Sequence, residues 1–469
     1  MITQKVKKQH IIESLRFDGS YHLSDGTLYL RKLRKMPHQE LQSLCSDIFT
    51  AGRSKRIYTE KDKGFPYLSN SDVVKGNPLD GCKYNSKKYA FDEPSFLKEG
   101  MIVTGRVGAI GQTAYITSEL EDNQAMGSDN IIRVVCKDKN ISGYVYSFLV
   151  SKYGNTLLNR LAAGGVQPYI SEDMLKDIPI PILSEEKQQK IHQLIVDASE
   201  LRVEANKLLQ ETETFLKESL DLPKLEKDDY EYFGNHSVGR EVSAFVRKSK
   251  EISSISINAF NYSKRIEKIV STIQNKDYLS LDECLNEKKF FSTGSFRRLE
   301  VNSTNGIKLL NQSDIFDIHK KGKILSRHFV GNVKLVEYGE VLIAGVGTLG
   351  EGETFCRSIF ANEELENQLI SGEFIRMKTN EQIPSGYLFA WLNSDYGFRL
   401  IRSTQTGTKL CRPIPNLLAK IPVPLMDREQ MNYIDKHVRE AHTDFYKAIV
   451  KENQAIALIE KEIDLWQVS

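Results

Sequence analysis

Three short motifs have residue types that could support catalysis. Residues 345–350 (Gly-Val-Gly-Thr-Leu-Gly) have the spacing of a dinucleotide-binding turn, but such a turn must open a helix, and the following Glu-Gly-Glu-Thr does not favour one. Glu185-Glu-Lys187 resembles the end of a nuclease motif, but the matching segment Asp427-Arg-Glu429 lacks the lysine. Gln167-Pro-Tyr169 resembles the Asn-Pro-Pro-Tyr motif of amino-methyltransferases, but no glycine-rich cofactor loop precedes it. We therefore expect no catalytic residue and no metal site.

Basic and amide side chains gather in segments that are expected to be loops. Residues 31–88 contain thirteen Lys or Arg residues against six Asp or Glu residues. Such side chains could bind DNA, because lysine and arginine contact phosphates, and asparagine and glutamine amides can pair with adenine through two hydrogen bonds. For any one of them, an ordinary solvated surface position remains the alternative. The candidate DNA contacts are Arg53, Lys55, Arg56, Ser69, Asn70, Arg106, Gln167, Tyr169, Arg297, Arg298, Asn311, Gln312, Thr408, Lys409 and Arg412.

The elements that would position these loops occur twice in the chain. Gly100–Gly111 matches Gly339–Gly350, and from Ser142 onward the two copies align at a constant offset of 243 residues without a gap. The alignment continues as far as Ile191 and Ile434. Chance rarely produces an ungapped register of this length, so we expect a tandem duplication of a globular domain followed by a helix.

Each copy mixes strand and helix signals. Short apolar runs predict strands, and longer runs with aromatic and aliphatic residues at helical spacing predict a helix. We expect an α+β fold with a strand-rich core and long polar loops. The expected strands are residues 101–104, 131–135, 341–344 and 374–377, and the expected helices are residues 144–161 and 387–401.

A long helix is expected to leave each domain through a proline-rich exit, Ile178-Pro-Ile-Pro181 or Ile421-Pro-Val-Pro424, that cannot itself be helical. Ser184 and Asp427 then provide N-caps. Apolar residues recur at steps of three and four, which predicts coiled-coil seams, with a slip of phase near residue 449. Because a lone helix of this kind is unstable, the two helices are expected to pair as an antiparallel coiled coil. The expected seam positions are Ile191, Leu194, Ala198, Leu201, Ala205, Leu208, Thr212 and Phe215, then Ile434, Val438, Ala441, Phe445, Ile449, Ile456, Ile459, Ile463 and Trp466.

Composition sets further limits on the class of protein. The chain has 469 residues, too many for one core, and 64 Lys or Arg residues nearly balance 62 Asp or Glu residues. A net charge of +2 does not by itself indicate that the protein binds nucleic acid. Its six cysteines are scattered without a Cys-x-x-Cys motif, and no apolar run is long enough to span a membrane. These features favour a cytoplasmic protein.

The duplication, the exits Ile178–Pro181 and Ile421–Pro424, and the helix starts Glu185-Glu-Lys-Gln188 and Arg428-Glu-Gln430 together resemble the specificity subunit of a type I restriction–modification enzyme. The resemblance covers nearly the whole chain. The first copy departs slightly, because Lys187 interrupts the usual Glu-Gln pair. Both residue types suit the first turn of a helix, so the departure is expected to be harmless.

The resemblance implies a non-catalytic subunit whose two domains each recognise one half of a bipartite, asymmetric site in double-stranded DNA. The helices would set the spacing between half-sites and dock two methyltransferase subunits, which bind S-adenosylmethionine. Two restriction subunits, which use ATP and Mg²⁺, could join them. No cofactor is expected in this chain. The implied parts are a first target-recognition domain (1–183), a first spacer helix (184–222), a linker (223–252), a second target-recognition domain (253–425) and a second spacer helix (426–469).

Other functions remain open at this point. A related modification-only or phage-defence system would use the same kind of subunit. A self-contained DNA methyltransferase or nuclease would require a cofactor motif, and the sequence contains none that fits. A coiled-coil adaptor that binds proteins alone would not need basic loops such as Gly52-Arg-Ser-Lys-Arg-Ile-Tyr58.

Overall fold

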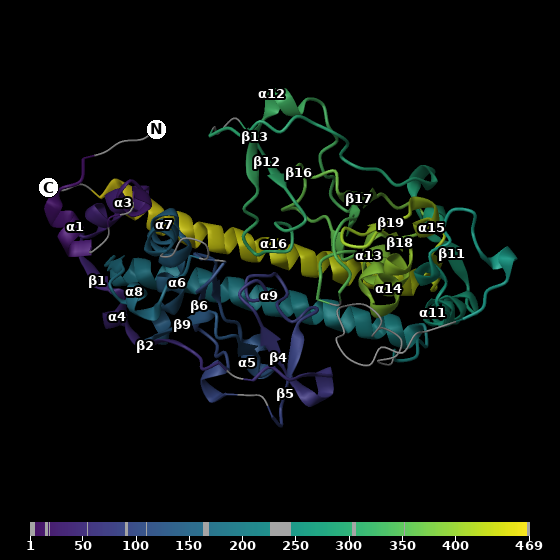
Figure 1. Ribbon diagram of the computed structural model, residues 1–469, viewed down its shortest axis with the longest axis horizontal. Coiled ribbons are helices and arrows are strands. Elements are labelled where there is room, and N and C mark those ends of the chain that lie inside the picture. The colour runs from purple at the N-terminus through teal and green to yellow at the C-terminus, as the bar shows by residue number, and fades with distance from the viewer. Residues whose placement is uncertain are drawn as a thin grey trace. The chain divides into compact units, whose positions relative to one another are not determined.

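The chain divides into two compact units, which we describe separately. The computed structural model describes residues 5–14, 17, 19–53, 55–89, 92–108, 110–162, 168–225, 245–302, 306–350 and 352–466. The first unit comprises Met1–Val203 and Lys447–Ser469, and the second comprises Glu204–Tyr446. Figure 1 shows both as mixtures of strands and helices, so the fold class is α+β. No helix within these described ranges is long and apolar enough to cross a membrane.

Two four-stranded sheets form the centre of the first unit. One has the order β2-β9-β6-β7 with antiparallel neighbours, and the other has the order β3-β5-β4-β8, in which β4 and β8 are parallel. The bounds are β2 Cys45–Thr50, β9 Ile131–Cys136, β6 Ile102–Gly105, β7 Thr113–Tyr115, β3 Tyr58–Thr59, β5 Lys83–Ser86, β4 Gly64–Leu68 and β8 Met126–Gly127. The helices are α1 Lys8–Ser14, α2 Gly19–His22, α3 Asp25–Leu33, α4 Leu41–Leu44, α5 Ser118–Asp122, α6 Ser142–Val150, α7 Lys152–Leu161, α8 Glu172–Lys176 and the start of α9 Glu185–Ser219.

The second unit has smaller sheets than the first, and their strands are connected in a similar order. Two three-stranded sheets have the orders β13-β12-β16 and β15-β14-β17, and β18 pairs with β19. The bounds are β12 Gly306–Leu310, β13 Lys323–Ser326, β16 Leu369–Ile370, β14 Val341–Ala344, β15 Ser358–Phe360, β17 Phe374–Met377, β18 Gln405–Thr406 and β19 Arg412–Pro413. The helices are α11 Lys264–Gln274, α12 Arg327–Val330, α13 Ser385–Asn393, α14 Asp395–Ser403, α15 Pro415–Leu418 and the start of α16 Arg428–Leu465. The four strands expected from the sequence are therefore present as β6, β9, β14 and β17.

The helices expected at 144–161 and 387–401 are each two helices, so this prediction was wrong in detail. Ser151 separates α6 from α7, and Ser394 separates α13 from α14; each hydroxyl accepts a hydrogen bond at 3.2 Å from the backbone nitrogen of Gly154 or Gly397. This is the N-cap geometry that starts a new helix. The glycines permit the tight junction, because a Cβ at either position would lie 2.1 Å from a carbonyl oxygen of the preceding helix.

The proline-rich exits are short strands that close each domain. β10 (Pro179–Pro181) pairs with β1 (His38–Glu40), and β20 (Pro422–Pro424) pairs with β11 (Tyr278–Ser280). The Tyr144 hydroxyl donates to the Pro181 carbonyl at 2.6 Å, and the Tyr387 hydroxyl makes the corresponding 2.7 Å bond to Pro424. The helix after each exit is therefore anchored to its own domain. At the start of α16, the Asp427 carboxylate accepts from the Gln430 nitrogen at 2.9 Å, as expected for an N-cap.

Within the first unit, the start of α9 packs against the end of α16. Ile191 and Ile195 of α9 share a hydrophobic core with Ala455, Ile459 and Ile463 of α16. Two ion pairs, Lys187–Glu462 and Asp197–Lys451, have N–O distances of 2.7 and 2.8 Å. Residue numbers rise along one helix as they fall along the other, so these segments run antiparallel.

A polar group is buried in the middle of this packing. The Glu452 carboxylate is fully buried and accepts hydrogen bonds from the Arg202 guanidinium and from the Tyr146 hydroxyl of α6. Burial, followed by the negative charge of Glu452, raises the pKa of Tyr146 well above its ordinary value, so this phenol stays protonated and donates. Burying the Glu452 carboxylate or the Arg202 guanidinium without a partner would be costly. Their contact therefore favours the register of the helices that brings them together.

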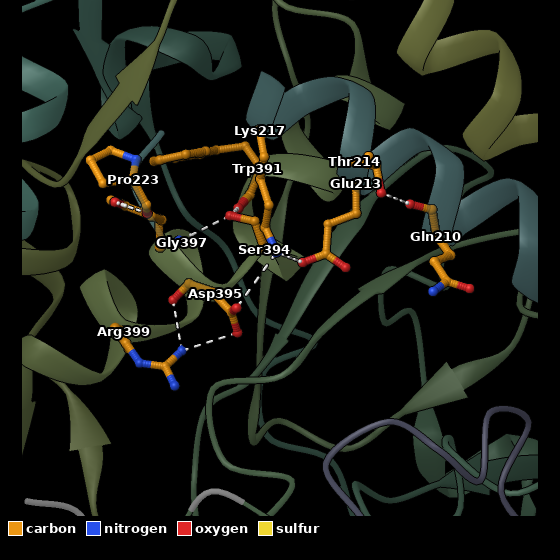
Figure 2. A network of polar contacts seen from close by, with 11 residues as sticks. Gln210, Glu213, Thr214, Lys217, Pro223, Trp391, Ser394, Asp395, Gly397 and Arg399 are labelled. Atoms are coloured by element: carbon orange, nitrogen blue, oxygen red, sulfur yellow. Dashed lines mark hydrogen bonds and ion pairs between the residues drawn. The ribbon is translucent and has the colours of Figure 1, made fainter. Parts of the chain in front are cut away.

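The end of α9 and the start of α16 complete the core of the second unit. Leu216 of α9, and Leu220 directly after this helix, lie in the same core as Ile434 and Val438 of α16. Figure 2 shows how the end of α9 is attached: the Lys217 amine lies 2.6 Å from Glu213 and 3.5 Å from Asp395, at the start of α14.

The same attachment continues past the end of α9. The Tyr396 hydroxyl donates to the Pro223 carbonyl at 2.7 Å. Arg399 donates to both the side chain and the backbone of Asp395 (Figure 2). Burial opposes ionisation of Asp395, but Arg399 and Lys217 lower its pKa below the ordinary value. The carboxylate is therefore charged at neutral pH and can hold Lys217.

A fully buried arginine occupies corresponding strand positions in the two units. Arg376 of β17 is paired with the Glu340 carboxylate through two hydrogen bonds of 2.9 Å, and it also donates to the carbonyls of Lys334 and Leu335. Arg133 of β9 donates to backbone carbonyls that include those of Gly127 and Ser128. Burial lowers the pKa of Arg133 to about 10. These side chains fix the turns beside them.

Replacing Arg376 with methionine is expected to destabilise the second unit by about 3–5 kcal/mol, because Glu340 would remain buried without its cation. Replacing Glu340 with methionine in the same chain should recover part of the loss, since a pair of apolar side chains leaves no buried charge. Urea unfolding of the single and double variants measures both effects. A single variant as stable as the wild type would show that the ion pair contributes nothing.

Candidate DNA interface

Four loops of the first unit meet at one place. The Arg106 nitrogen donates to the Asn130 carbonyl at 2.9 Å, and the Arg106 carbonyl accepts from the Ile170 nitrogen at 3.0 Å. The Asn70 amide donates to the Val107 carbonyl at 2.8 Å, and Val107 forms a β-bridge with Tyr169. Predicted contact residues that are far apart in the sequence therefore lie on neighbouring loops.

The basic loop that precedes β3 joins this group through Asp129. The Arg56 guanidinium lies 2.7 Å from the carboxylate of Asp129, and Arg53 lies 3.8 Å from it. The side chain of Asn85, which is fully buried, accepts a hydrogen bond from the Ile57 nitrogen at 2.8 Å and so attaches the basic loop to the interior of the unit. Sequence reasoning identified neither Asp129 nor Asn85, because their importance depends on contacts with loops distant in the chain.

The predicted residues of the first unit differ in how much they present to solvent. The side chain of Arg53 is 88% exposed, whereas that of Arg56 is 42% exposed. Lys55 and Tyr169 are exposed, and Asn70, Ser69 and Arg106 are half-buried. The Ser69 hydroxyl is bonded to Asp72 at 2.6 Å. Gln167 lies outside the described residues.

The second unit assembles a corresponding group of loops. The Gln312 amide donates to the Val346 carbonyl at 3.1 Å, as Asn70 does to Val107, and its oxygen accepts from the Val346 nitrogen at 3.2 Å. Gly347 and Cys411 form a β-bridge. Because Gln312 is buried and both ends of its amide are bonded within the protein, base contact by this residue would require those bonds to open. Asn311 is half-buried and bonded to Asp314.

The remaining predicted contacts of the second unit are exposed. Arg297 stacks on Phe329 with its guanidinium 4.9 Å from the ring centre, and Arg298 lies 5.7 Å from the ring of Phe296. Such stacking holds a guanidinium without using its N–H donors. The exposed contacts of this unit are Arg297, Arg298, Thr408, Lys409 and Arg412.

Two of the motifs that resembled catalytic signatures take part in the packing of the fold. The Gly345–Gly350 segment leads from β14 into the bridge with Cys411, and the next helix in the described part of the chain starts only at Ser385. Lys187 is paired with Glu462 in the helix packing. In the described ranges, no cluster of three or more His, Cys, Asp or Glu residues is suited to hold a metal ion.

Comparison with known families finds a match in the first part of the chain. Residues 44–214 match a family model described as the type I restriction modification DNA specificity domain. The match spans 171 of the 469 residues, and over this segment the chain is similar to the specificity domains of type I restriction–modification systems. Specificity subunits of this family recognise DNA and are non-catalytic.

Solved structures include similar chains at low sequence identity. The type I restriction–modification S subunit from M. genitalium is 14% identical over 91% of this chain and 93% of its own, with a TM-score of 0.32. The HsdS subunit from Thermoanaerobacter tengcongensis is 13% identical over 91% of this chain and 96% of its own, with a TM-score of 0.27. At these scores the likenesses add nothing to the family match. A comparison with curated proteins finds no significant match.

Proposed function

We propose that the chain is the specificity subunit of a type I restriction–modification complex and that each unit reads one half of a bipartite DNA site. The observation that carries this proposal is the repeated loop arrangement: the amide of Asn70 is tied to Val107 in one unit, and the amide of Gln312 is tied to Val346 in the other. This supports a tandem duplication in which the frame is shared. The exposed side chains around it differ, which supports recognition of two unlike sequences.

The helices are proposed to act as the spacer between the half-sites. α9 contains 35 residues and α16 contains 38, which correspond to about 52 and 57 Å at 1.5 Å per residue. Antiparallel contacts in the first unit, and the attachment of the end of α9 in the second, support a paired arrangement. Their outward faces are proposed to dock two methyltransferase subunits.

The cofactors are proposed to belong to partner subunits. S-adenosylmethionine would bind the methyltransferase subunits, and ATP and Mg²⁺ would bind restriction subunits where these are present. This chain would supply double-stranded DNA recognition, with phosphate contacts positioning each unit and base contacts specifying the sequence.

The proposal is tested by sequencing methylated bases in cells with and without this chain. The expected result is a motif of two short, unlike half-sites around an unread gap, present only when the chain is expressed. Methylation that persists without the chain would contradict the proposal. The same experiment supplies the target sequence for the binding assays below.

The purified chain alone is expected neither to methylate nor to cut DNA. The measurement is incorporation of labelled methyl groups from S-adenosylmethionine into genomic DNA, together with gel analysis for cleavage. The co-purified complex with methyltransferase subunits is the positive control. Incorporation above background by the chain alone, abolished by mutation of the chain, would contradict a non-catalytic role.

A further inference from the structure

A negative side chain contacts two of the arginines that are proposed to bind DNA. Asp129 lies in the turn between β8 and β9, with 18% of its side chain exposed. One carboxylate oxygen is 2.7 Å from Arg56, and the other is 3.8 Å from Arg53. A carboxylate in this position opposes phosphate binding, so its presence requires a reason other than affinity.

The turn that carries Asp129 is held on several sides. The Ser128 nitrogen donates to the Leu68 carbonyl at 2.9 Å, and the Asn130 carbonyl accepts from Arg106 at 2.9 Å. The buried guanidinium of Arg133 donates to the carbonyls of Gly127 and Ser128. With backbone bonds on both sides, Asp129 is a fixed point against which a flexible side chain can be oriented.

Arg56 is held by more contacts than Arg53. Its guanidinium is bonded to Asp129 and lies 5.7 Å from the ring centre of the buried Tyr67. The bond to Asp129 raises the pKa of Arg56, so the side chain stays cationic. Arg53, at 88% exposed and with the longer contact, keeps its conformational freedom.

We propose that Asp129 orients Arg56 to read a guanine in the major groove and leaves Arg53 to contact phosphate. An arginine has five N–H donors, of which Asp129 engages one, so a donor pair remains for the O6 and N7 atoms of guanine. The carboxylate also cancels one positive charge, which reduces attraction to DNA of any sequence. Asp129 therefore acts as a positioning residue that favours discrimination over affinity.

The second unit provides an internal control, because the position that corresponds to Asp129 is a glycine, and the carboxylate of that turn, Glu373, accepts from the Gln312 amide at 3.2 Å. Ser128 and Ser371 make the same bond, to Leu68 and Leu310, and the residue that follows Ser371 is Gly372. A Cβ at Gly372 would lie 3.1 Å from the Gly294 carbonyl, so there is little room there for a side chain. A change at Asp129 should therefore alter one half-site and leave the other unchanged.

The inference rests on the proposed function and is tested with the full chain co-purified with its methyltransferase subunits. Binding is measured for the methylated target sequence, for duplexes with each base pair of one half-site substituted, and for a random duplex, over a range of salt concentrations. The variants are Asp129→Asn, Arg56→Ala and Arg53→Ala. Glu121→Gln is the matched control, since Glu121 pairs with Lys98 and bonds the Glu99 nitrogen, and neither is a predicted DNA contact.

Asp129→Asn is expected to reduce discrimination at one G·C pair at least about fivefold, to strengthen binding to the random duplex and to steepen its salt dependence by about one unit. Arg56→Ala should lose about 5- to 150-fold discrimination at the same pair without the gain on random DNA. Arg53→Ala should weaken all duplexes alike and reduce the salt dependence by about one unit. Glu121→Gln should match the wild type.

Two results would overturn the inference while leaving the proposed function intact. The first is that the wild type prefers its target and the Asp129→Asn variant discriminates among the substituted duplexes as well as the wild type does. The other is equal behaviour of Arg56→Ala and Arg53→Ala across all duplexes. If the wild type itself showed no preference among duplexes, the proposed function would fail instead. Thermal unfolding of each variant separates lost binding from lost folding.

Discussion

Exchanging residues 253–425 for the corresponding domain of a relative is expected to replace one half of the methylated motif and to leave the other half unchanged. The exposed side chains Arg297, Lys409 and Arg412 move with the exchanged segment, whereas Arg53 and Arg56 remain. Because base contacts specify a sequence locally, each half-site should follow its own domain. Methylation sequencing of cells that express the chimera measures the outcome.

The exchange must respect how the segment is attached. The Tyr396 hydroxyl bonds the Pro223 carbonyl, and Lys217 pairs with Asp395, so residues outside the segment depend on residues inside it. A donor that keeps a tyrosine and an aspartate at these places is therefore preferred. Returning only the loops at 292–298, 311–312 and 407–412 to their original sequence should restore the original half-site. A chimera in which both half-sites change, or neither does, would show that the domains are not independent readers.

Inserting four residues after Val203 in α9 and four after Tyr446 in α16 is expected to lengthen the unread gap by one or two base pairs. These positions are where the two units divide, so the contacts inside each unit stay intact. Four residues add about 6 Å of helix, and DNA rises about 3.4 Å per base pair. The gap length in the methylated motif is the measurement.

Insertion into α9 alone is the control for this experiment. A mismatch of four residues between the helices must be absorbed by displacing one set of contacts, such as the pairing of Arg202 with Glu452. That variant should therefore unfold at lower urea concentration and lose methylation. An active double insertion with an unchanged gap would contradict the spacer role of the helices.

The frame of each domain could be predicted because its signals are local. Apolar runs identified the strands at 131–136 and 374–377, and prolines followed by a capping residue identified the start of α16. The junctions at Ser151 and Ser394 were missed, because an apolar period continues through both positions while the cap and the glycine break the helix. The domain limits and the DNA contacts remain predictions.

The helix seam was harder to predict, because a buried charge does not stand out in a hydrophobic pattern. In α16 the buried positions run through Ala448, Glu452 and Ala455 in steps of four and three, so the expected slip near residue 449 is absent. The expected Leu201 and Leu208 of α9 are only half-buried, and Arg202 is buried instead. The sequence contains both partners, but only their contact shows that they belong inside.

The completion of the first unit by residues 455–463 has a consequence for synthesis on the ribosome. The start of α9 emerges with the first domain, and Ala455, Ile459 and Ile463 emerge about 260 to 270 residues after Ile191 and Ile195. At about 5–20 residues per second, Ile191 and Ile195 wait roughly 10–55 s for these partners. During that interval a nascent chain exposes an apolar helix face that chaperones and proteases can recognise. Chains broken off early would keep that face exposed, which is the kind of surface that quality control recognises.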